Sequence, residues 1–181
     1  MKYKSGLRNL TLSALFLALC LLLPFLTGQI PTIGQALSPM HIPVLLCGFV
    51  CGWPWGLGVG FIAPLLRYLL FGMPPIYPTG LAMAFELATY GAATGIFYRL
   101  LPQRTPYIYT SLIVSMLLGR CVWGIARFIM AGLSGSEFSF AMFLSGAFTT
   151  AVPGIICHII IVPAIVIILK KGKLIPVESN I

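Results

Sequence analysis

Residues 41–71 read HIPVLLCGFVCGWPWGLGVGFIAPLLRYLLF. Two apolar segments flank the run Gly52-Trp53-Pro54-Trp55-Gly56, which combines helix breakers with two tryptophans of the kind found at the headgroup level of membranes. A helix that crosses a bilayer needs about 20 mostly apolar residues. This stretch therefore predicts two transmembrane helices, the first one short, that are joined in a tight hairpin.

The same criterion, applied on both sides of the hairpin, predicts an all-α protein: a six-helix transmembrane bundle that forms a single membrane domain over residues 1–181. The expected spans lie near residues 10–27, 39–52, 54–72, 79–101, 107–131 and 139–169. The composition agrees, because 59% of the residues are hydrophobic and only 8% are charged. The first span is not expected to be a signal peptide, since residues 24–31 offer no small-residue cleavage site.

The basic residues outside the spans predict the orientation of the bundle. They all fall on one side of it: Lys2, Lys4, Arg8, Arg99, Arg104, Lys170, Lys171 and Lys173. The opposite loops, residues 28–38, 73–78 and 132–138, contain no Lys or Arg. Because cytoplasmic loops carry an excess of Lys and Arg, both termini are expected in the cytoplasm. Topology and arginines inside the spans account for the net charge of +8, so nucleic-acid binding is not expected.

Four ionisable residues lie inside the predicted spans, namely Arg67, Glu86, Arg120 and Arg127. A charge at the centre of a bilayer costs about 2.5–3.5 kcal/mol on insertion scales, so such residues usually face a protein interior. Three arginines and one glutamate make that interior electropositive. The pattern predicts a binding site for a small anionic molecule, in which Arg127 contacts the anion and Arg120 either does the same or bridges helices.

The depth of each charge in the bilayer predicts how they pair. Arg67 precedes the outer end of its span by about a turn and a half, and Glu86 follows the outer start of the next span by about two turns. The two side chains are therefore expected at matching depth, where a buried ion pair would offset part of the desolvation cost of each. All four charges fall in the outer half or the middle of the membrane, so the site is expected to open outward.

The outer loops have the composition of a lid over such a site. Residues 27–35 and 72–80 combine prolines and glycines with neutral hydrogen-bonding side chains, among them Gln35 and Tyr77. With His41, at the start of the second span, these two residues complete the set of candidate substrate-binding residues. Ordinary interhelical turns would have a similar composition, and that alternative stays open.

The sequence contains few residues that could carry out catalysis. Gly132-Leu133-Ser134-Gly135 matches the G-x-S-G of rhomboid intramembrane proteases, with His158 as a conceivable base. The serine falls in a surface loop, however, no second histidine is expected to be buried, and the chain contains no aspartate. The chain is therefore not expected to be an enzyme or to hold a cofactor. No metal site is expected either, because all five cysteines lie in apolar runs: Cys20, Cys47, Cys51, Cys121 and Cys157.

Small residues recur at a spacing of four. The pairs Gly48 to Gly52 and Gly91 to Gly95 match G-x-x-x-G, which lets helices approach closely and in multispan proteins usually serves internal packing, with partner binding as the alternative. Ala14 and Ala18 form a similar small groove on the first helix, and on their own they also indicate packing.

These features together resemble the substrate-binding S-component of energy-coupling factor (ECF) vitamin transporters. The resemblance covers nearly the whole chain and rests on six short spans, the Ala14-x-x-x-Ala18 motif, and His41-Ile42-Pro43-Val44 followed by the glycine-rich hairpin from Gly48 to Gly60. The last feature is similar to the pantothenate- and folate-type branch. The chain has no nucleotide-binding G-x-x-x-x-G-K-[ST], as expected of a subunit that is energised by others.

The resemblance implies a role for each part of the chain. It implies a multi-pass protein of the bacterial plasma membrane that binds a vitamin from the outer side and releases it inward. Ala14 and Ala18 would pack on a membrane coupling subunit, which two cytoplasmic ATPase subunits drive. Pantothenate is the preferred substrate because it carries a carboxylate and hydroxyls, whereas lipoate, folate, a cobalamin precursor and a neutral pyrimidine remain open. The competing functions are a small-solute channel and a non-catalytic structural membrane subunit.

Overall fold

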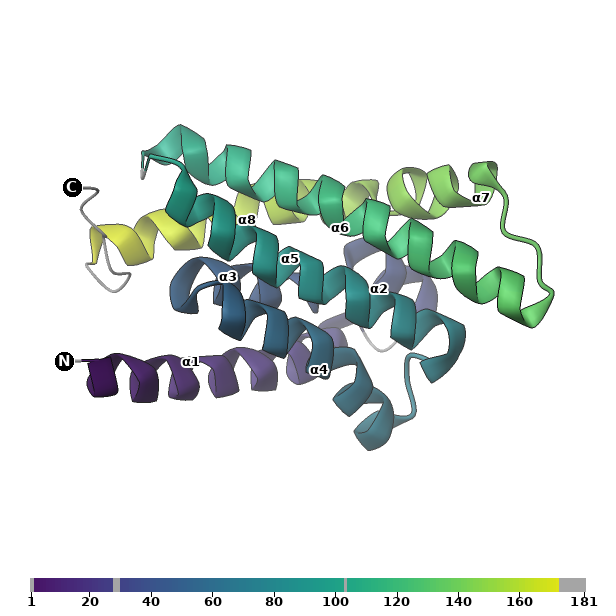
Figure 1. Cartoon of the computed structure of the whole chain (residues 1–181), viewed down its shortest axis with the longest axis horizontal. Helices are drawn as coiled ribbons and strands as arrows, with labels where there is room; N and C mark the ends of the chain where they lie inside the picture. The colour runs from purple at the N-terminus through teal and green to yellow at the C-terminus, as the bar shows by residue number, and fades with distance from the viewer. Residues whose placement is uncertain (1, 28–29, 103, 173–181) are drawn as a thin grey trace.

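The computed structural model describes residues 2–27, 30–102 and 104–172, without the side chains of residues 2–5, 31 and 35. Every regular element within these residues is a helix, so the all-helical prediction is confirmed (Figure 1). In chain order the elements are α1 (Lys2–Leu22), η1 (Leu23–Thr27), α2 (Pro31–Leu37), α3 (His41–Cys51), α4 (Trp53–Phe71), η2 (Ile76–Gly80), α5 (Leu81–Leu100), α6 (Thr105–Ser134), α7 (Phe140–Leu144), η3 (Ser145–Thr149) and α8 (Val152–Lys171).

Four helical segments are long and apolar enough to cross a membrane: Gly6–Thr27, Trp53–Phe71, Thr105–Ser134 and Val152–Lys171. Two further helices lie among them. The α5 helix has 20 residues and buries ten of them, including Glu86, and α3 has 11 residues, of which ten are buried. A helix that is surrounded by protein does not need the apolar surface of one that faces lipid. The chain is thus a multi-pass membrane protein with at least two interior helices.

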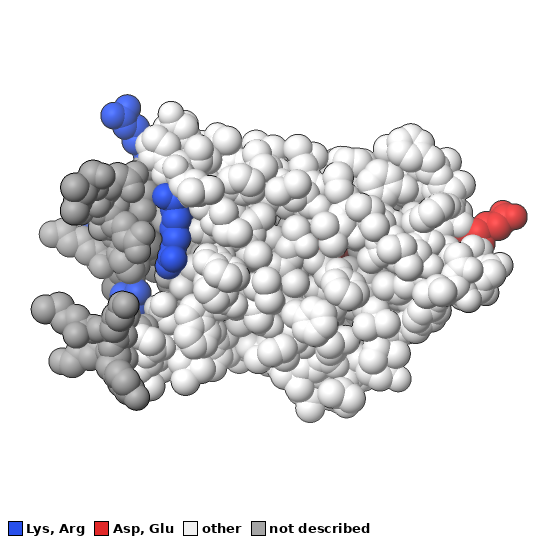
Figure 2. Space-filling view, viewed as in Figure 1, with Lys and Arg blue, Asp and Glu red and all other residues white. Residues whose placement is uncertain are grey.

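The charged residues separate along the long axis of the molecule. The beginning of α1, the turn between α5 and α6, and the end of α8 lie at one end (Figure 1). On the face drawn in Figure 2, Lys and Arg side chains gather at this end, an acidic side chain lies at the opposite end, and the surface between them is uncharged. A surface of this kind suits contact with lipid, in which exposed charges are costly.

The hairpin in the opening stretch forms as predicted. The α3 helix ends at Cys51 and α4 begins at Trp53, so Gly52 alone connects them, with a φ of 92° that favours glycine. Glycines then bring these helices against α5. A Cβ atom at Gly56 would lie 2.5 Å from the carbonyl oxygen of Gly91, and one at Gly48 would lie equally close to that oxygen. The glycine pairs of α3 and α5 therefore serve internal packing.

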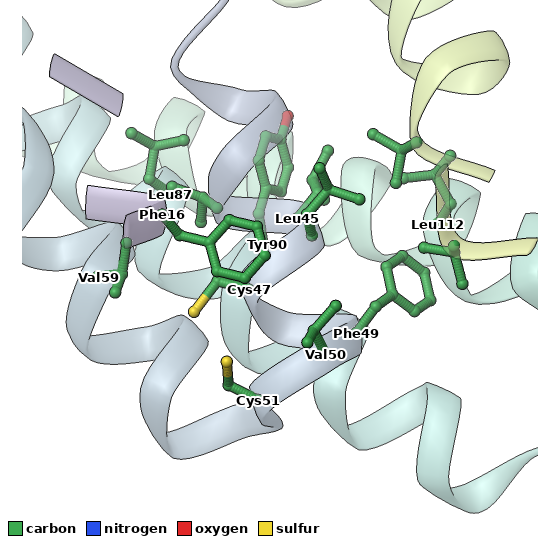
Figure 3. Packing of buried hydrophobic residues seen from close by; sticks show 14 of the residues in the cluster. Phe16, Leu45, Cys47, Phe49, Val50, Cys51, Val59, Leu87, Tyr90 and Leu112 are labelled. Carbon is green, nitrogen blue, oxygen red and sulfur yellow. The ribbon is translucent and has the colours of Figure 1, made fainter. Parts of the chain in front are cut away.

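The apolar core lies where α1, α3, α4, α5, α6 and α8 meet (Figure 3). Phe16 of α1 reaches this cluster, together with Leu45 of α3 and Leu112 of α6. Cys47 and Cys51 belong to it as free thiols, in agreement with a packing role. Burial of this cluster fixes α5 at the centre of the bundle.

The structure differs from the sequence-based spans in two places. The loop at residues 28–38 contains the helix α2, and the stretch at residues 139–169 is divided into α7, η3 and α8 rather than forming one helix. Pro153 lies in the first turn of α8, a position that suits proline because no N–H partner is needed there. Hydropathy alone misses this break, since the residues on both sides of it are apolar.

Candidate functional site

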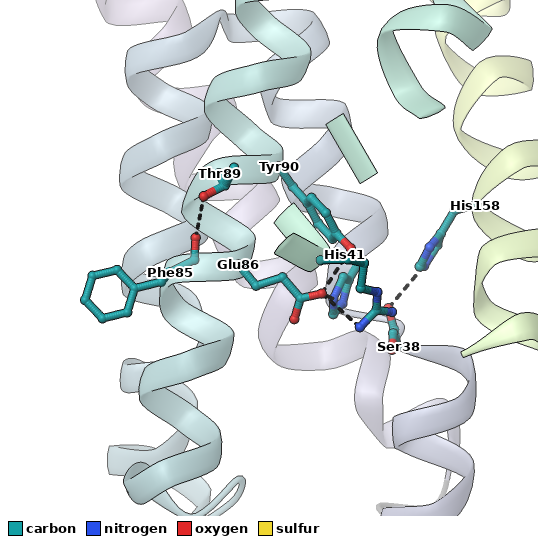
Figure 4. Close-up of polar contacts among 8 residues, drawn as sticks. Ser38, His41, Phe85, Glu86, Thr89, Tyr90 and His158 are labelled. Carbon is teal, nitrogen blue, oxygen red and sulfur yellow. Dashed lines mark hydrogen bonds and ion pairs between the residues drawn. The ribbon is translucent and has the colours of Figure 1, made fainter. Parts of the chain in front are cut away.

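A buried polar cluster is centred on one carboxylate oxygen. Nη1 of Arg120, on α6, donates to Oε1 of Glu86, on α5, at 2.9 Å (Figure 4). The hydroxyl of Tyr90 donates to the same oxygen at 3.0 Å, because residues four apart lie on one face of a helix. Glu86 is 2% exposed and Arg120 is 8% exposed. The ion pair and the added hydrogen bond offset part of the cost of removing both charges from water.

His41, the first residue of α3, borders this cluster with unused hydrogen-bonding capacity. Its Nε2 lies 3.7 Å from Oε1 of Glu86, beyond hydrogen-bond distance. Both ring nitrogens are buried and have no hydrogen-bond partner within the described residues, and the same is true of Nε of Arg120. A buried polar atom without a partner costs about 1–3 kcal/mol. Two further buried atoms without a hydrogen-bond partner within the described residues, the hydroxyl of Tyr98 and Nε of Arg127, belong to residues outside this cluster.

His158 of α8 completes the inner wall of the cluster. Its ring stacks on that of His41, with a centroid distance of 5.6 Å and an interplanar angle of 14°. The Nε2 atom of His158 is 3.3 Å from the carbonyl oxygen of Ser38, the residue that follows α2 (Figure 4). The expectation that no second histidine is buried was wrong, because His41 and His158 are 2% and 1% exposed.

The short helix α2 is held over this region by α8. A Cβ atom at Gly154 would lie 2.6 Å from the carbonyl oxygen of Ala36, so only a glycine permits the observed approach. One helical turn further along α8, His158 binds the carbonyl oxygen of Ser38. The loop between the first two predicted spans therefore contains an ordered helix that is tied to α8. The side chain of Gln35, also predicted to line the site, lies outside the described part of the chain.

The predicted ion pair between Arg67 and Glu86 is wrong. Nη1 of Arg67 donates to the carbonyl oxygen of Leu21 at 2.8 Å, and the guanidinium carbon lies 5.5 Å from the ring centroids of both Phe25 and Phe71. Leu21 belongs to the last turn of α1, where carbonyl groups lack intrahelical partners and a cation is favourable. Arg67 thus caps α1, and equal depth did not imply the same side of the bundle.

Arg127 lies two turns along α6 from Arg120 and differs from it in having no carboxylate partner within the described residues. Its guanidinium carbon is 5.6 Å from the ring centroid of Phe138, and its buried Nε has no hydrogen-bond partner there either. The ring of Trp123, one turn below, packs against the rings of Phe138 and Phe143 at 6.1 and 6.3 Å. Arg127 is therefore a half-buried cation in aromatic surroundings.

Tyr77 does not join the polar cluster. Its hydroxyl donates to the carbonyl oxygen of Met130 at 2.6 Å and so ties η2 to the C-terminal end of α6. The structure thus brings His41, Glu86 and Arg120 together. Tyr90 and His158 were missed, although Tyr90 follows Glu86 by the spacing that places two residues on one helix face. No local pattern pointed to His158, whose partner Ser38 is 120 residues away.

The serine of the G-x-S-G match has other partners. The Ser134 hydroxyl lies 3.0 Å from the carbonyl oxygen of Met130 and 2.8 Å from the hydroxyl of Ser136, whereas His158 bonds to Ser38. Nucleophile and base are thus engaged separately, and nothing in this arrangement points to catalysis.

Comparison with known proteins identifies the family. The sequence profile described as "ECF transporter, substrate-specific component" matches residues 8–166, most of the chain. Searches of curated proteins and of solved structures return no match. Substrate-specific components of ECF transporters are substrate-binding transport subunits that work with an ECF module of a coupling subunit and ATPases, and they are not enzymes. With its apolar helices and its buried polar cluster, this chain belongs to the family of ECF transporter substrate-specific components.

Proposed function

We propose that the chain binds a small anionic vitamin or vitamin precursor between α3, α5, α6 and α8 and delivers it for import, with pantothenate as the preferred substrate. One observation is the main support for this assignment. Three buried polar atoms, the two ring nitrogens of His41 and Nε of Arg120, have no hydrogen-bond partner within the described residues. Such atoms are costly unless something fills the site.

The same observation weighs against the two competing functions. A purely structural subunit would gain stability from satisfying or replacing these polar groups, since apolar side chains of similar volume are often as stable as a buried ion pair. A channel needs a polar path from one face of the membrane to the other. The buried charges instead lie in separate places: Arg120 pairs with Glu86, Arg67 binds the end of α1, and Arg127 lies on the side away from the predicted cytoplasmic end.

We also propose six crossings, with α3 and α5 added to the four long apolar segments, and both termini in the cytoplasm of a bacterial cell. The gathering of Lys and Arg at one end of the molecule supports this orientation (Figure 2). Arg67 and Tyr77 would then act by holding α1 and η2 near the site rather than by touching the substrate.

The surface of α1 supports the proposed contact with a membrane coupling subunit and its two cytoplasmic ATPases. Ala14 and Ala18 are both exposed, whereas Phe16 and Cys20 of the same helix are buried in the core. The two alanines therefore face away from this chain's own helices, which leaves a shallow groove where a partner helix could approach closely.

The direct test is to purify the full-length protein from cells that express it, denature it, and identify released small molecules by mass spectrometry. A vitamin-like anion in stoichiometric amount is the expected result, and Arg120→Ala should retain much less of it. Arg104→Gln is the matched control, because Arg104 is exposed at the other end of α6. Repeated purification of empty protein would favour the structural alternative.

A further inference from the structure

We infer, on the basis of the substrate-binding function proposed above, that the substrate is an elongated molecule with two poles. An uncharged hydrogen-bonding group faces His41 and Nε of Arg120, and an anionic group faces Arg127. The side-chain chemistry of the two places differs, and that difference sets both the polarity and the orientation of the bound molecule.

The inner pole contains one paired positive and negative charge. Glu86 and Arg120 form an ion pair at 2.9 Å, so their charges largely cancel. An incoming anion would meet the Glu86 carboxylate and an incoming cation would meet the guanidinium, and both repulsions are strong away from water. Both ring nitrogens of His41 lack hydrogen-bond partners within the described residues, and an imidazole nitrogen donates or accepts according to its tautomer. A hydroxyl or amide group, which can donate and accept, matches this place.

The outer pole is positive. Arg127 is half-buried and has no carboxylate partner in the described part of the chain, and the nearby Glu137 is exposed. A guanidinium binds a carboxylate or a phosphate through two parallel hydrogen bonds and is only weakly hydrated. The rings of Phe138 and Trp123 lie beside it and limit the access of competing water. An anionic group is therefore the complement of this place.

The spacing of the two poles sets the length of the substrate. Arg120 and Arg127 are seven residues apart on one helix, which places them on the same side at a separation of about 10 Å. Between them the ring of Phe143 covers Trp123 and Gly124 of α6, and a molecule that reaches both poles takes the place of this ring. A compact anion such as nicotinate reaches only one pole, whereas an extended chain with an acid at one end reaches both.

Three probe molecules of similar length test the two poles independently. Pantothenate carries a carboxylate at one end and amide and hydroxyl groups toward the other, panthenol replaces the carboxylate by a hydroxymethyl group, and octanoate has the carboxylate alone. Each is titrated into the purified full-length protein by calorimetry. We expect pantothenate to bind at least about tenfold more tightly than either of the other two.

The variants assign each pole to its residue. Arg127→Gln should lower the affinity for pantothenate at least about tenfold and leave the affinity for panthenol unchanged. His41→Phe should lower the affinity for pantothenate and for panthenol, and leave the affinity for octanoate unchanged. His41→Gln keeps a donor and an acceptor and should recover part of the affinity for pantothenate. Arg104→Gln, at the other end of α6, should change none of the three.

Three results would overturn the two-pole assignment. One is panthenol or octanoate binding as tightly as pantothenate. Another is an equal loss of affinity for all three probes in both Arg127→Gln and His41→Phe. The third is a stoichiometric molecule, released from the purified protein, that is compact or carries no anionic group; that result would leave the substrate-binding function standing. A protein that retains no small molecule and binds none of the three probes would overturn the proposed function as well.

Discussion

Two regions of this bundle differ in which atoms make their closest contacts, backbone atoms in one and side-chain rings in the other. Where α4 meets α5, glycines bring the helix backbones into contact, and a single added carbon at Gly56 would collide with Gly91. At the C-terminal end of α6, by contrast, α7 has no buried residue, and the close contact is made by a side chain, because the ring of Phe143 covers Gly124 and meets the ring of Trp123 at 6.3 Å. The first region can hold Glu86 in a fixed place. The second meets α6 through side chains, so we expect it to be displaced at lower cost and propose that a substrate enters there.

The largest effect is expected from breaking the ion pair at the inner edge of the close-packed region. Glu86→Leu leaves the buried guanidinium of Arg120 without its carboxylate, which typically costs about 3–5 kcal/mol. The double variant Glu86→Leu/Arg120→Leu removes both charges and should regain most of that loss. Chemical denaturation in detergent measures both values, and a single variant as stable as the wild type would contradict the account.

Substitution at the glycine contact between α4 and α5 should lower the stability by a slightly smaller amount. Gly56→Leu inserts a side chain where a Cβ atom alone would lie 2.5 Å from the Gly91 carbonyl oxygen, and overpacking of this kind costs about 1–3 kcal/mol. Gly58→Leu, on the same helix, is the matched control because a Cβ atom there meets nothing within 4 Å. Equal melting temperatures of the two variants would show that the close packing has been misplaced.

A smaller effect is expected where the lid is tied to α8. His158→Leu removes the donor to the Ser38 carbonyl oxygen, a hydrogen bond of a kind that contributes about 0.5–1.5 kcal/mol. His158→Gln keeps a donor and should restore part of this stability. Faster hydrogen exchange confined to α2 in the leucine variant would locate the effect, and unchanged exchange there would argue against the tie.

The smallest effect on the isolated protein is expected on α1. Ala18→Trp changes an exposed side chain, and such surface substitutions usually change stability by less than about 0.5 kcal/mol. Substrate affinity in detergent should therefore persist, while uptake by cells that carry the coupling subunit and ATPases should be lost. Joint loss of stability and binding would instead place Ala18 against this chain's own helices.

The sequence predicted the close-packed region better than the outer one. The hairpin at Gly52 and the packing glycines can be predicted from local patterns, because turn conformation and small-residue spacing depend on residues that are close in the sequence. Burial of Glu86 and Arg120 followed from the cost of charge in lipid.

What the sequence did not predict depends on direction and on contacts between distant segments. The depth of a residue along a helix follows from residue counts, but the side of the bundle that it faces does not. Arg67 faces the end of α1, whereas Glu86 faces Arg120, and so the sequence-based ion pair contained the wrong arginine. The tie from His158 to Ser38 joins residues 120 positions apart. The break before Val152 lies within a continuous apolar run.

Hydrogen exchange of the purified protein with and without pantothenate tests most directly whether one region is scaffold and the other is the substrate site. Added pantothenate should slow exchange in α2, at the start of α3 around His41, in α6 from Arg120 onward and in α7, and should leave the buried glycine contact of α4 and α5 unchanged. Protection confined to that buried contact, or no change in any segment, would contradict the account.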